Sequence, residues 1–403
     1  MSSLHRAGLI VLGLLGTSTV VAACAGSDEE PMIPSDDAGG GGGDGAAPDV
    51  VEGDVSDAGS DTNAPSQDAC TSAGWCSLGV DPQLSFLDLW PLEGGSAIAI
   101  AARNGRSAVM EYEGSAWQII HEVPFVLGSL WATKTDVWVA GGEPGYVAHG
   151  HREGTVWKWS VRSIPVQAPV STVWGTGEQE LYALADARVW RLADDDADWA
   201  VDFGGEVAGV DTTVTALTGT GKDDVWVTGA RGAFPACGFV AHKRGGSWVT
   251  LIEGDPDPTF PWPPACLPVG SAITVHGPAT IAGATAPNEL VTIIEELDYN
   301  VVARIRHAAD GGVDMATSNL PAETSFPRDR RSIWGTSADD LYLAGFSKVR
   351  RGKGLWADGG SWEISTVALE GIPLVKLFHV VRGTRADDVW LAGESYVFRK
   401  TIH

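Results

Sequence analysis

Two histidines on one short segment form the clearest metal-binding pattern in the chain. His149 and His151 are separated by a single glycine, so in a β-strand both imidazole rings lie on the same face. Imidazole nitrogens are common ligands of divalent transition metals. The sequence supplies no third ligand for this pair, and we therefore predict that it binds no metal.

Two charged clusters are also weak candidates for chemistry. The segment from Asp194 to Asp198 carries four aspartates, but their spacing does not match an EF-hand loop, and we expect a solvated turn there. The segment from Arg328 to Arg331 carries three arginines, as a sialidase would need, without the Asp-box repeats that accompany such a triad. No Ser-His-Asp set or phosphate-binding loop is identifiable. The sequence predicts no catalytic residues, no metal and no cofactor.

The N-terminus contains features of export. An uncharged apolar stretch from Ala7 to Ala22 follows a short region with one arginine, and it is too short and Gly-rich for a membrane span. It ends in Val21-Ala22-Ala23-Cys24, which resembles the lipobox of bacterial lipoproteins. The resemblance implies that residues 1–23 are a signal peptide and that Cys24 carries acyl chains such as palmitate. The alternative is an ordinary signal peptide in which Cys24 is incidental.

The anchor places the protein in the cell envelope, and Ala25 after it favours the outer membrane, on its periplasmic or surface face. Residues 25–69 contain twelve acidic residues, a glycine run and no Lys or Arg. Such a stretch cannot bury enough apolar surface to fold, so residues 24–69 are predicted to be a disordered tether. Residues 70–403 form the globular part.

The net charge of −25 argues against nucleic-acid partners. Residues 70–403 alone carry −14. Their four cysteines, Cys70, Cys76, Cys237 and Cys266, form an even set that indicates two disulfide bonds in an exported protein. Their spacings match no zinc finger or ribbon.

A repeat of about 45 residues determines the expected fold. Five copies align, and the equivalent threonines are Thr133, Thr176, Thr220, Thr336 and Thr384. Degenerate copies surround Leu89-Trp90-Pro91 and run from Ile273-Thr274-Val275-His276-Gly277 to Ile281-Ala282-Gly283. Each copy holds an inner strand, a turn with Thr and Asp that we expect to bond nearby backbone N–H groups, and an apolar second strand. A tryptophan follows most copies, as at Trp117, Trp157, Trp199, Trp248 and Trp362.

Units of this length with four short strands are typical of β-propeller blades. We predict an all-β propeller of about seven four-stranded blades, with six and eight left open. The aromatic residue at the centre of each second strand should pack between blades. The chain ends before the last blade has a fourth strand, so we expect residues 73–79 to supply it, pinned by a Cys70–Cys76 bond, because propellers avoid exposed edges.

The repeat W-G-T-x-x-x-D-[VL]-[WY]-x-x-G, opened by Gly74-Trp75-Cys76, resembles that of propeller lipoproteins and secreted proteins of myxobacteria and related predatory bacteria. The resemblance covers residues 74–403 and implies the fold and an envelope location. It implies no activity. The repeat differs from the kelch and WD patterns and has only a loose similarity to tectonin-type lectin propellers.

The loops that follow the second and fourth strands of a blade lie on one face of a propeller. Cys237 and Cys266 fall in two such loops of the fourth blade, which makes a bond between them plausible. Phe234, Phe260 and Trp262 lie nearby but outside the repeat pattern. They are the best candidates for a binding surface, and the alternative is that they cap the edge of the blade. The favoured function is a lipid-anchored, non-enzymatic binding or scaffold protein for an envelope protein or glycan. The alternative is an enzyme acting on extracellular polysaccharide or glycan, which carboxylates with an Arg or His at the channel would favour.

Overall fold

The computed structural model describes residues 70–401 apart from 178–179, 195–196, 205–211, 233–235, 258–264, 271, 296–299, 322–329, 346–347 and 370–371. The described residues form strands and turns and contain no helix. Accordingly, no apolar helix of membrane-spanning length occurs among them. The predicted all-β class is confirmed.

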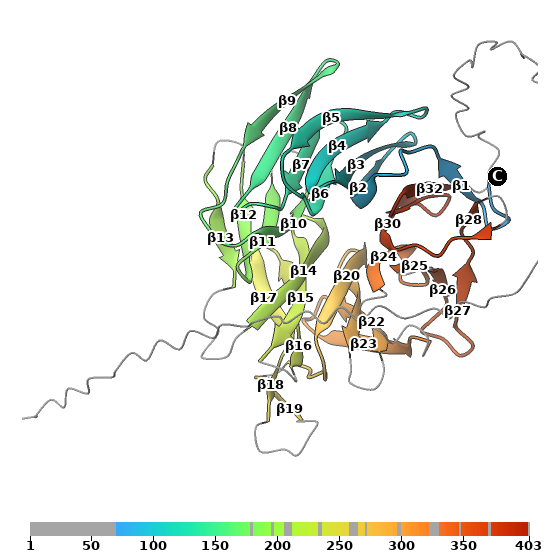
Figure 1. Ribbon diagram of the computed structural model, residues 1–403. Helices are drawn as coiled ribbons and strands as arrows, with labels where there is room; N and C mark the ends of the chain where they lie inside the picture. The colour runs from blue at the N-terminus through green and yellow to red at the C-terminus, as the bar shows by residue number, and fades with distance from the viewer. Residues whose placement is uncertain are drawn as a thin grey trace, which may run out of the picture. The chain divides into compact units, whose positions relative to one another are not determined.

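Seven antiparallel four-stranded sheets surround a common centre (Figure 1). We number these blades 1 to 7, beginning with the blade that contains β2. The innermost strand of each blade contacts the innermost strand of the next, and the innermost strand of blade 7 contacts that of blade 1. These contacts close a ring, which confirms the predicted propeller and gives seven blades.

The innermost strands of blades 1 to 7 are β2 (Ser85–Leu92), β6 (Ser129–Ala132), β10 (Val170–Gly175), β14 (Thr212–Gly221), β20 (Ala279–Ala286), β24 (Arg330–Ser337) and β30 (Phe378–Arg385). The second strands are β3 (Ser96–Arg103), β7 (Asp136–Ala140), β11 (Leu181–Ala185), β15 (Asp224–Arg231), β21 (Glu289–Glu295), β25 (Asp340–Gly345) and β31 (Asp388–Gly393). The third strands are β4 (Arg106–Tyr112), β8 (Val147–Glu153), β12 (Arg188–Leu192), β16 (Cys237–Arg244), β22 (Asn300–His307), β26 (Val349–Lys353) and β32 (Tyr396–Thr401). The outermost strands are β5 (Trp117–Val123), β9 (Val156–Val161), β13 (Ala200–Phe203), β17 (Ser247–Ile252), β23 (Val313–Asn319), β27 (Ser361–Ser365) and β1 (Trp75–Leu78). Two short hairpins, β18 (Gly254–Pro256) with β19 (Cys266–Pro268) and β28 (Ala368–Leu369) with β29 (Ile372–Pro373), follow blades 4 and 6.

The second strands are buried because each has apolar side chains on both faces and a neighbouring blade against each face. Their central aromatic residues are almost inaccessible: Trp138, Tyr182, Trp226, Tyr342 and Trp390 are at most 4% exposed. The prediction that these residues pack between blades is confirmed. Burying such large side chains is the main favourable term holding neighbouring blades together.

The last blade is completed from the beginning of the globular part, as expected. Strand β1 pairs antiparallel with β32, and Trp75 is opposite Lys400. The Trp75 side chain is fully buried and donates a hydrogen bond from Nε1 to Ser365 Oγ at 2.9 Å. Cys70 and Cys76 form a disulfide bond that holds the turn before this strand.

The expected copy of the repeat in blade 5 is displaced by one strand. Residues 281–283, expected in a second strand, lie in the innermost strand β20, and the second strand is β21. Residues 273–277, expected as the inner strand, instead lie along blade 4, where Ile273 bridges Ile252 and His276 bridges Cys237. The prediction was wrong because short apolar runs ending in glycine occur in both places, and only strand pairing distinguishes them.

Candidate functional site

One position on the innermost strands recurs around the central channel. In each blade it is the residue paired with the centre of the second strand, for example Trp174 opposite Tyr182. The seven equivalent residues are Trp90, Trp131, Trp174, Thr218, Gly283, Trp334 and Arg382. Four of the seven positions therefore carry an indole, blades 4 and 5 carry small residues, and blade 7 carries an arginine.

The glycine after the tryptophan in the repeat has a packing role. A Cβ on Gly175 would lie 2.8 Å from the Trp131 ring of the preceding blade, and a Cβ on Gly219 would lie 2.6 Å from the Trp174 ring. Gly383 meets the Trp334 ring in the same way, at 2.5 Å. These three indoles thus lie against the backbone of the next blade, where only glycine leaves room for them.

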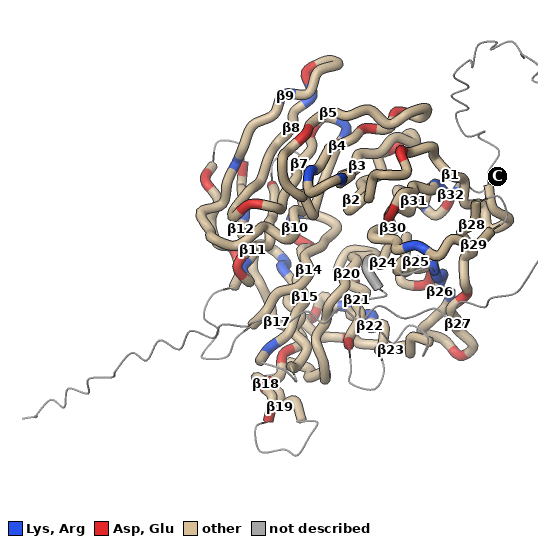
Figure 2. The backbone as a smooth tube through the Cα atoms, in the orientation of Figure 1, with Lys and Arg blue, Asp and Glu red and all other residues tan. Residues whose placement is uncertain are grey.

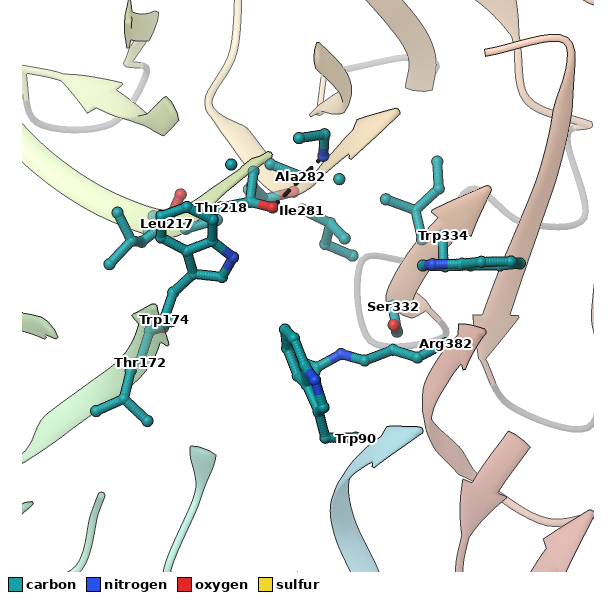
Figure 3. Close-up of a pocket in the computed structure, with 18 of the residues that line it drawn as sticks. Trp90, Thr172, Trp174, Leu217, Thr218, Ile281, Ala282, Ser332, Trp334 and Arg382 are labelled. Carbon is teal, nitrogen blue, oxygen red and sulfur yellow. Dashed lines mark hydrogen bonds between the residues drawn. The ribbon is translucent and has the colours of Figure 1, made fainter. Parts of the chain in front are cut away.

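A cavity of about 390 Å³ lies within the ring of innermost strands, a size suited to a small ligand or part of a larger one. It is bounded by residues of blades 1, 3, 4, 5, 6 and 7. The close-up shows Trp90, Trp174 and Trp334 around the same open space (Figure 3). The small residues Thr218 and Gly283 leave the volume that indoles occupy elsewhere. The cavity therefore arises where blades 4 and 5 carry small residues in place of indoles.

Arg382 supplies the cationic group of this cavity. Its guanidinium lies over the Trp90 ring, 4.6 Å from the centroid, and Figure 3 shows it reaching towards that ring. Its Nη1 is 3.1 Å from Asp88 Oδ1 and donates to the Leu89 carbonyl oxygen at 3.2 Å. These contacts fix the guanidinium between the last blade and the first.

Asp88 is held by backbone groups of two blades. Its carboxylate accepts hydrogen bonds from Leu89 N–H and from Leu130 N–H of blade 2, each at 2.8 Å. Burial raises the pKa of this carboxyl above its usual range, and the Arg382 charge and the two N–H groups only partly offset that effect. Asp88 therefore links blades 7, 1 and 2.

Hydroxyl groups complete the polar lining of the cavity. Thr215 donates to the Ala279 carbonyl oxygen at 2.8 Å, and Ser332 donates to the Val381 carbonyl oxygen at 3.1 Å. Both bonds join neighbouring blades. Among the described lining residues there is no carboxylate and no histidine. This set of groups can stack on a ring and bond hydroxyl or carboxylate groups, but it offers no acid–base pair.

The acidic residue of the repeat turn was expected to bond nearby backbone N–H groups, and the structure gives it a different main partner. In five blades it binds a basic side chain of the third strand, at the position paired with the second-strand aromatic residue. The pairs are Asp136–His149, Glu180–Arg191, Asp224–His242, Asp340–Arg351 and Asp388–Arg399. Acidic and basic residues accordingly lie close together along the blades (Figure 2). The threonine acts as expected in blade 2, where Thr133 Oγ1 accepts hydrogen bonds from the N–H groups of Thr135 and Asp136 at 3.2 and 2.9 Å.

Blade 2 brings both residues of the His149–His151 pair onto one carboxylate. Asp136 Oδ1 is 2.9 Å from His149 Nε2 and 2.8 Å from His151 Nδ1. His149 is buried and stacks on Trp138, whereas about half of the His151 side chain is exposed. Sequence reasoning missed Asp136, because the β7–β8 register, which places it opposite His151, is not visible in the residue order.

The second expected disulfide bond, Cys237–Cys266, is present. It joins the start of β16 to the hairpin after blade 4. At the base of this hairpin the buried Arg231 forms ion pairs with Glu253 and with Asp255. Phe234, Phe260 and Trp262 lie outside the described residues, as do Cys24, Asp195, Asp196 and Arg328. The predicted surface at the three aromatic residues stays a prediction.

Comparison of the sequence with protein-family models and with curated proteins finds no match. Solved structures with the same fold include YCF48 bound to a D1 peptide, with a TM-score of 0.56 and 13% identity over 83% of this chain and 99% of that one. Another is a catalytically inactive variant of virginiamycin B lyase from Staphylococcus aureus with quinupristin, with a TM-score of 0.57 and 10% identity over 82% and 99% of the two chains. A chain of the mitotic checkpoint complex matches with a TM-score of 0.52 and 12% identity over 82% and 95%. At these identities the likeness shows the propeller fold alone.

Proposed function

We propose that this protein is an exported, lipid-anchored propeller that acts as a non-enzymatic binding or scaffold protein for an envelope protein or glycan. The observation that carries the binding role is the lining of the central cavity. Indole faces stack on sugar rings and on apolar side chains, and a fixed guanidinium with hydroxyl groups bonds polar or carboxylate groups. Such a lining supports recognition of a ligand segment in the channel.

The export proposal is supported by sequence and by cysteine use. The signal-like N-terminus ends at Cys24, and both cysteine pairs of the globular part are disulfide-bonded, as is typical of oxidising compartments. Replacing Cys24 with Ser should release the protein from the membrane fraction and abolish incorporation of labelled fatty acid. Unchanged membrane association of the variant would refute the lipid anchor.

The same fold serves both binding and chemistry in other proteins. YCF48 has been solved with a peptide and the lyase with quinupristin, so the fold does not select between binding and catalysis. The choice rests on the cavity, whose described lining offers aromatic faces and one guanidinium in place of paired carboxylates. Turnover of envelope polysaccharide by the purified protein would favour the enzyme instead.

A binding experiment can separate the cavity from the predicted loop surface. Full-length protein is used to capture envelope proteins and glycans, which are identified and then tested in purified form. Trp334→Ala and Arg382→Met should reduce the affinity for the purified ligand, while Arg106→Met, on an exposed residue of β4, should not. A loss confined to the Phe260→Ala/Trp262→Ala double variant would move the site to the loop. Equal affinity in all variants would refute both surfaces.

A further inference from the structure

Blade 2 differs in its acid–base pair from the three blades in which the base is an arginine. In blades 3, 6 and 7 the base that meets the turn acid is Arg191, Arg351 or Arg399. A guanidinium stays protonated and has no lone pair for a metal. Blade 2 has His149 at the same position, opposite Trp138. The replacement turns a structural ion pair into a set of groups able to bind a metal.

A second position of the third strand also has histidine in blade 2 where other blades have Arg or Lys. The residue directly opposite the turn acid is Arg306 in blade 5 and Lys353 in blade 6. In blade 2 it is His151, opposite Asp136. In blade 4 the turn acid, Asp224, binds His242, but the other nitrogen of that ring, Nδ1, is directed to His307. In blade 2, by contrast, two imidazoles converge on one carboxylate.

We propose that Asp136, His149 and His151 form a site for a divalent transition-metal ion, with Zn²⁺ as its ligand. The three donor atoms all lie within 4.8 Å of one another. Donors of a tetrahedral zinc ion lie about 3.3 Å apart. Admitting the ion therefore requires the two carboxylate–imidazole contacts, now 2.9 and 2.8 Å, to lengthen by about half an ångström, and the two imidazole nitrogens to adopt the same spacing. Two imidazoles and one carboxylate leave a fourth position, which is filled by water or by a donor from a binding partner.

Two neighbouring groups hold the donors in place. Thr135 donates a hydrogen bond to Asp136 Oδ2 at 2.6 Å, which orients the carboxylate. The His149 ring stacks on Trp138 with a centroid distance of 4.0 Å and an interplanar angle of 3°. Such supporting contacts fix ligand direction in metal sites. The exposed edge of His151 leaves the ion accessible from solvent.

The test is a Zn²⁺ titration of the chelator-treated, full-length protein, followed by calorimetry and by Co²⁺ absorption as a report on coordination. Cys24→Ser is carried in every sample, because a free thiol would compete for the metal; the four other cysteines are disulfide-bonded. We expect one saturable site and a tetrahedral Co²⁺ spectrum. His151→Gln should weaken binding at least about 100-fold, and Thr135→Val about 10-fold.

His276→Gln is the matched control, because His276 is exposed and lies outside the cluster. It should leave affinity and stoichiometry unchanged. If His149→Gln fails to fold because its ring is buried, His151→Gln still decides the question. The proposal is overturned if the parent protein shows no saturable binding, or if His151→Gln and His276→Gln bind equally well. The site does not depend on the proposed cavity function, and neither result bears on the other.

Discussion

The guanidinium of Arg382 lies 3.1 Å from the carboxylate of Asp88, which joins the innermost strand of blade 7 to that of blade 1. Because Asp88 also accepts the Leu130 N–H, one carboxylate connects three consecutive blades at the channel. This contact closes the ring on its inside, as the pairing of β1 with β32 closes it on the outside.

Breaking the inner closure should destabilise the ring. Asp88→Asn replaces one carboxylate oxygen with an NH₂ group, which cannot accept from the three donors around it. Arg382→Met leaves a buried carboxylate without its cation. Each change should lower the free energy of unfolding by about 1–3 kcal/mol in denaturant titrations. The double variant should lose less than the sum of the two single changes, because the partners share one interaction. Strictly additive losses would mean that the pair does not couple the blades.

The outer closure depends on Trp75. Trp75→Ala removes a fully buried ring that packs edge-on against Tyr342 at 6.2 Å. The cavity left behind should cost about 3–5 kcal/mol of unfolding free energy. Trp75→Phe, which keeps an aromatic ring but loses the bond to Ser365 and part of the ring volume, should cost less. Similar losses in the two variants would contradict a main contribution from packing of the aromatic ring.

Gly219 tests whether the glycine packed against a channel indole is needed for stability. A methyl group there would meet the Asp224 carbonyl oxygen and the Trp174 ring, so Gly219→Ala should destabilise by about 1–3 kcal/mol. Gly221 on the same strand has open space at its Cβ position. Gly221→Ala should therefore change stability by less than about 0.5 kcal/mol. Thermal unfolding of the two variants side by side gives the comparison.

A pair of buried histidines between blades 4 and 5 should make stability depend on pH. His242 Nδ1 and His307 Nδ1 lie 2.8 Å apart, and the other nitrogen of His242 bonds Asp224. Burial, then the charges of His242 and Arg244, lower the pKa of His307 below its usual value. The unfolded chain therefore takes up a proton near pH 6.5 that the folded chain resists.

It follows that the unfolding free energy is highest above about pH 6.5 and falls as the pH drops through the lowered pKa of His307. Denaturant unfolding between pH 8 and pH 5 measures this slope. His307→Gln should flatten it, while His276→Gln should leave it unchanged. A slope that is the same in the parent protein and in His307→Gln would exclude this pair as its source.

The sequence predicts the architecture well because the repeat encodes local strand pairs. The prediction for Leu89-Trp90-Pro91 and the strand after it is correct, although that copy is degenerate. The prediction for blade 5 is wrong by one strand because apolar runs ending in glycine occur twice there, and Val291 stands where five other blades have Trp or Tyr to mark the second strand. The prediction of the propeller fold therefore depends on the five intact copies and their spacing.

Side-chain chemistry is harder to predict because it depends on pairs that are distant along the chain. The channel cavity arises where Thr218 and Gly283 replace indoles, and those positions become equivalent only once the register is known. Asp136 approaches His151 through the pairing of β7 with β8. Individual residues of both sites are visible in the sequence, but nothing in the residue order shows that they meet.

The pairing of Trp75 with Lys400 has a consequence for how the protein is made. The earliest strand of the ring to leave the ribosome finds its partner only when the last one has been synthesised and, under the proposed export, moved across the membrane. Until then six blades can assemble in order, but the seventh blade keeps an unpaired strand edge. Contacts between residues so far apart in sequence form slowly. The Cys70–Cys76 bond spans few residues and needs no distant partner, so it can shape the waiting strand in advance.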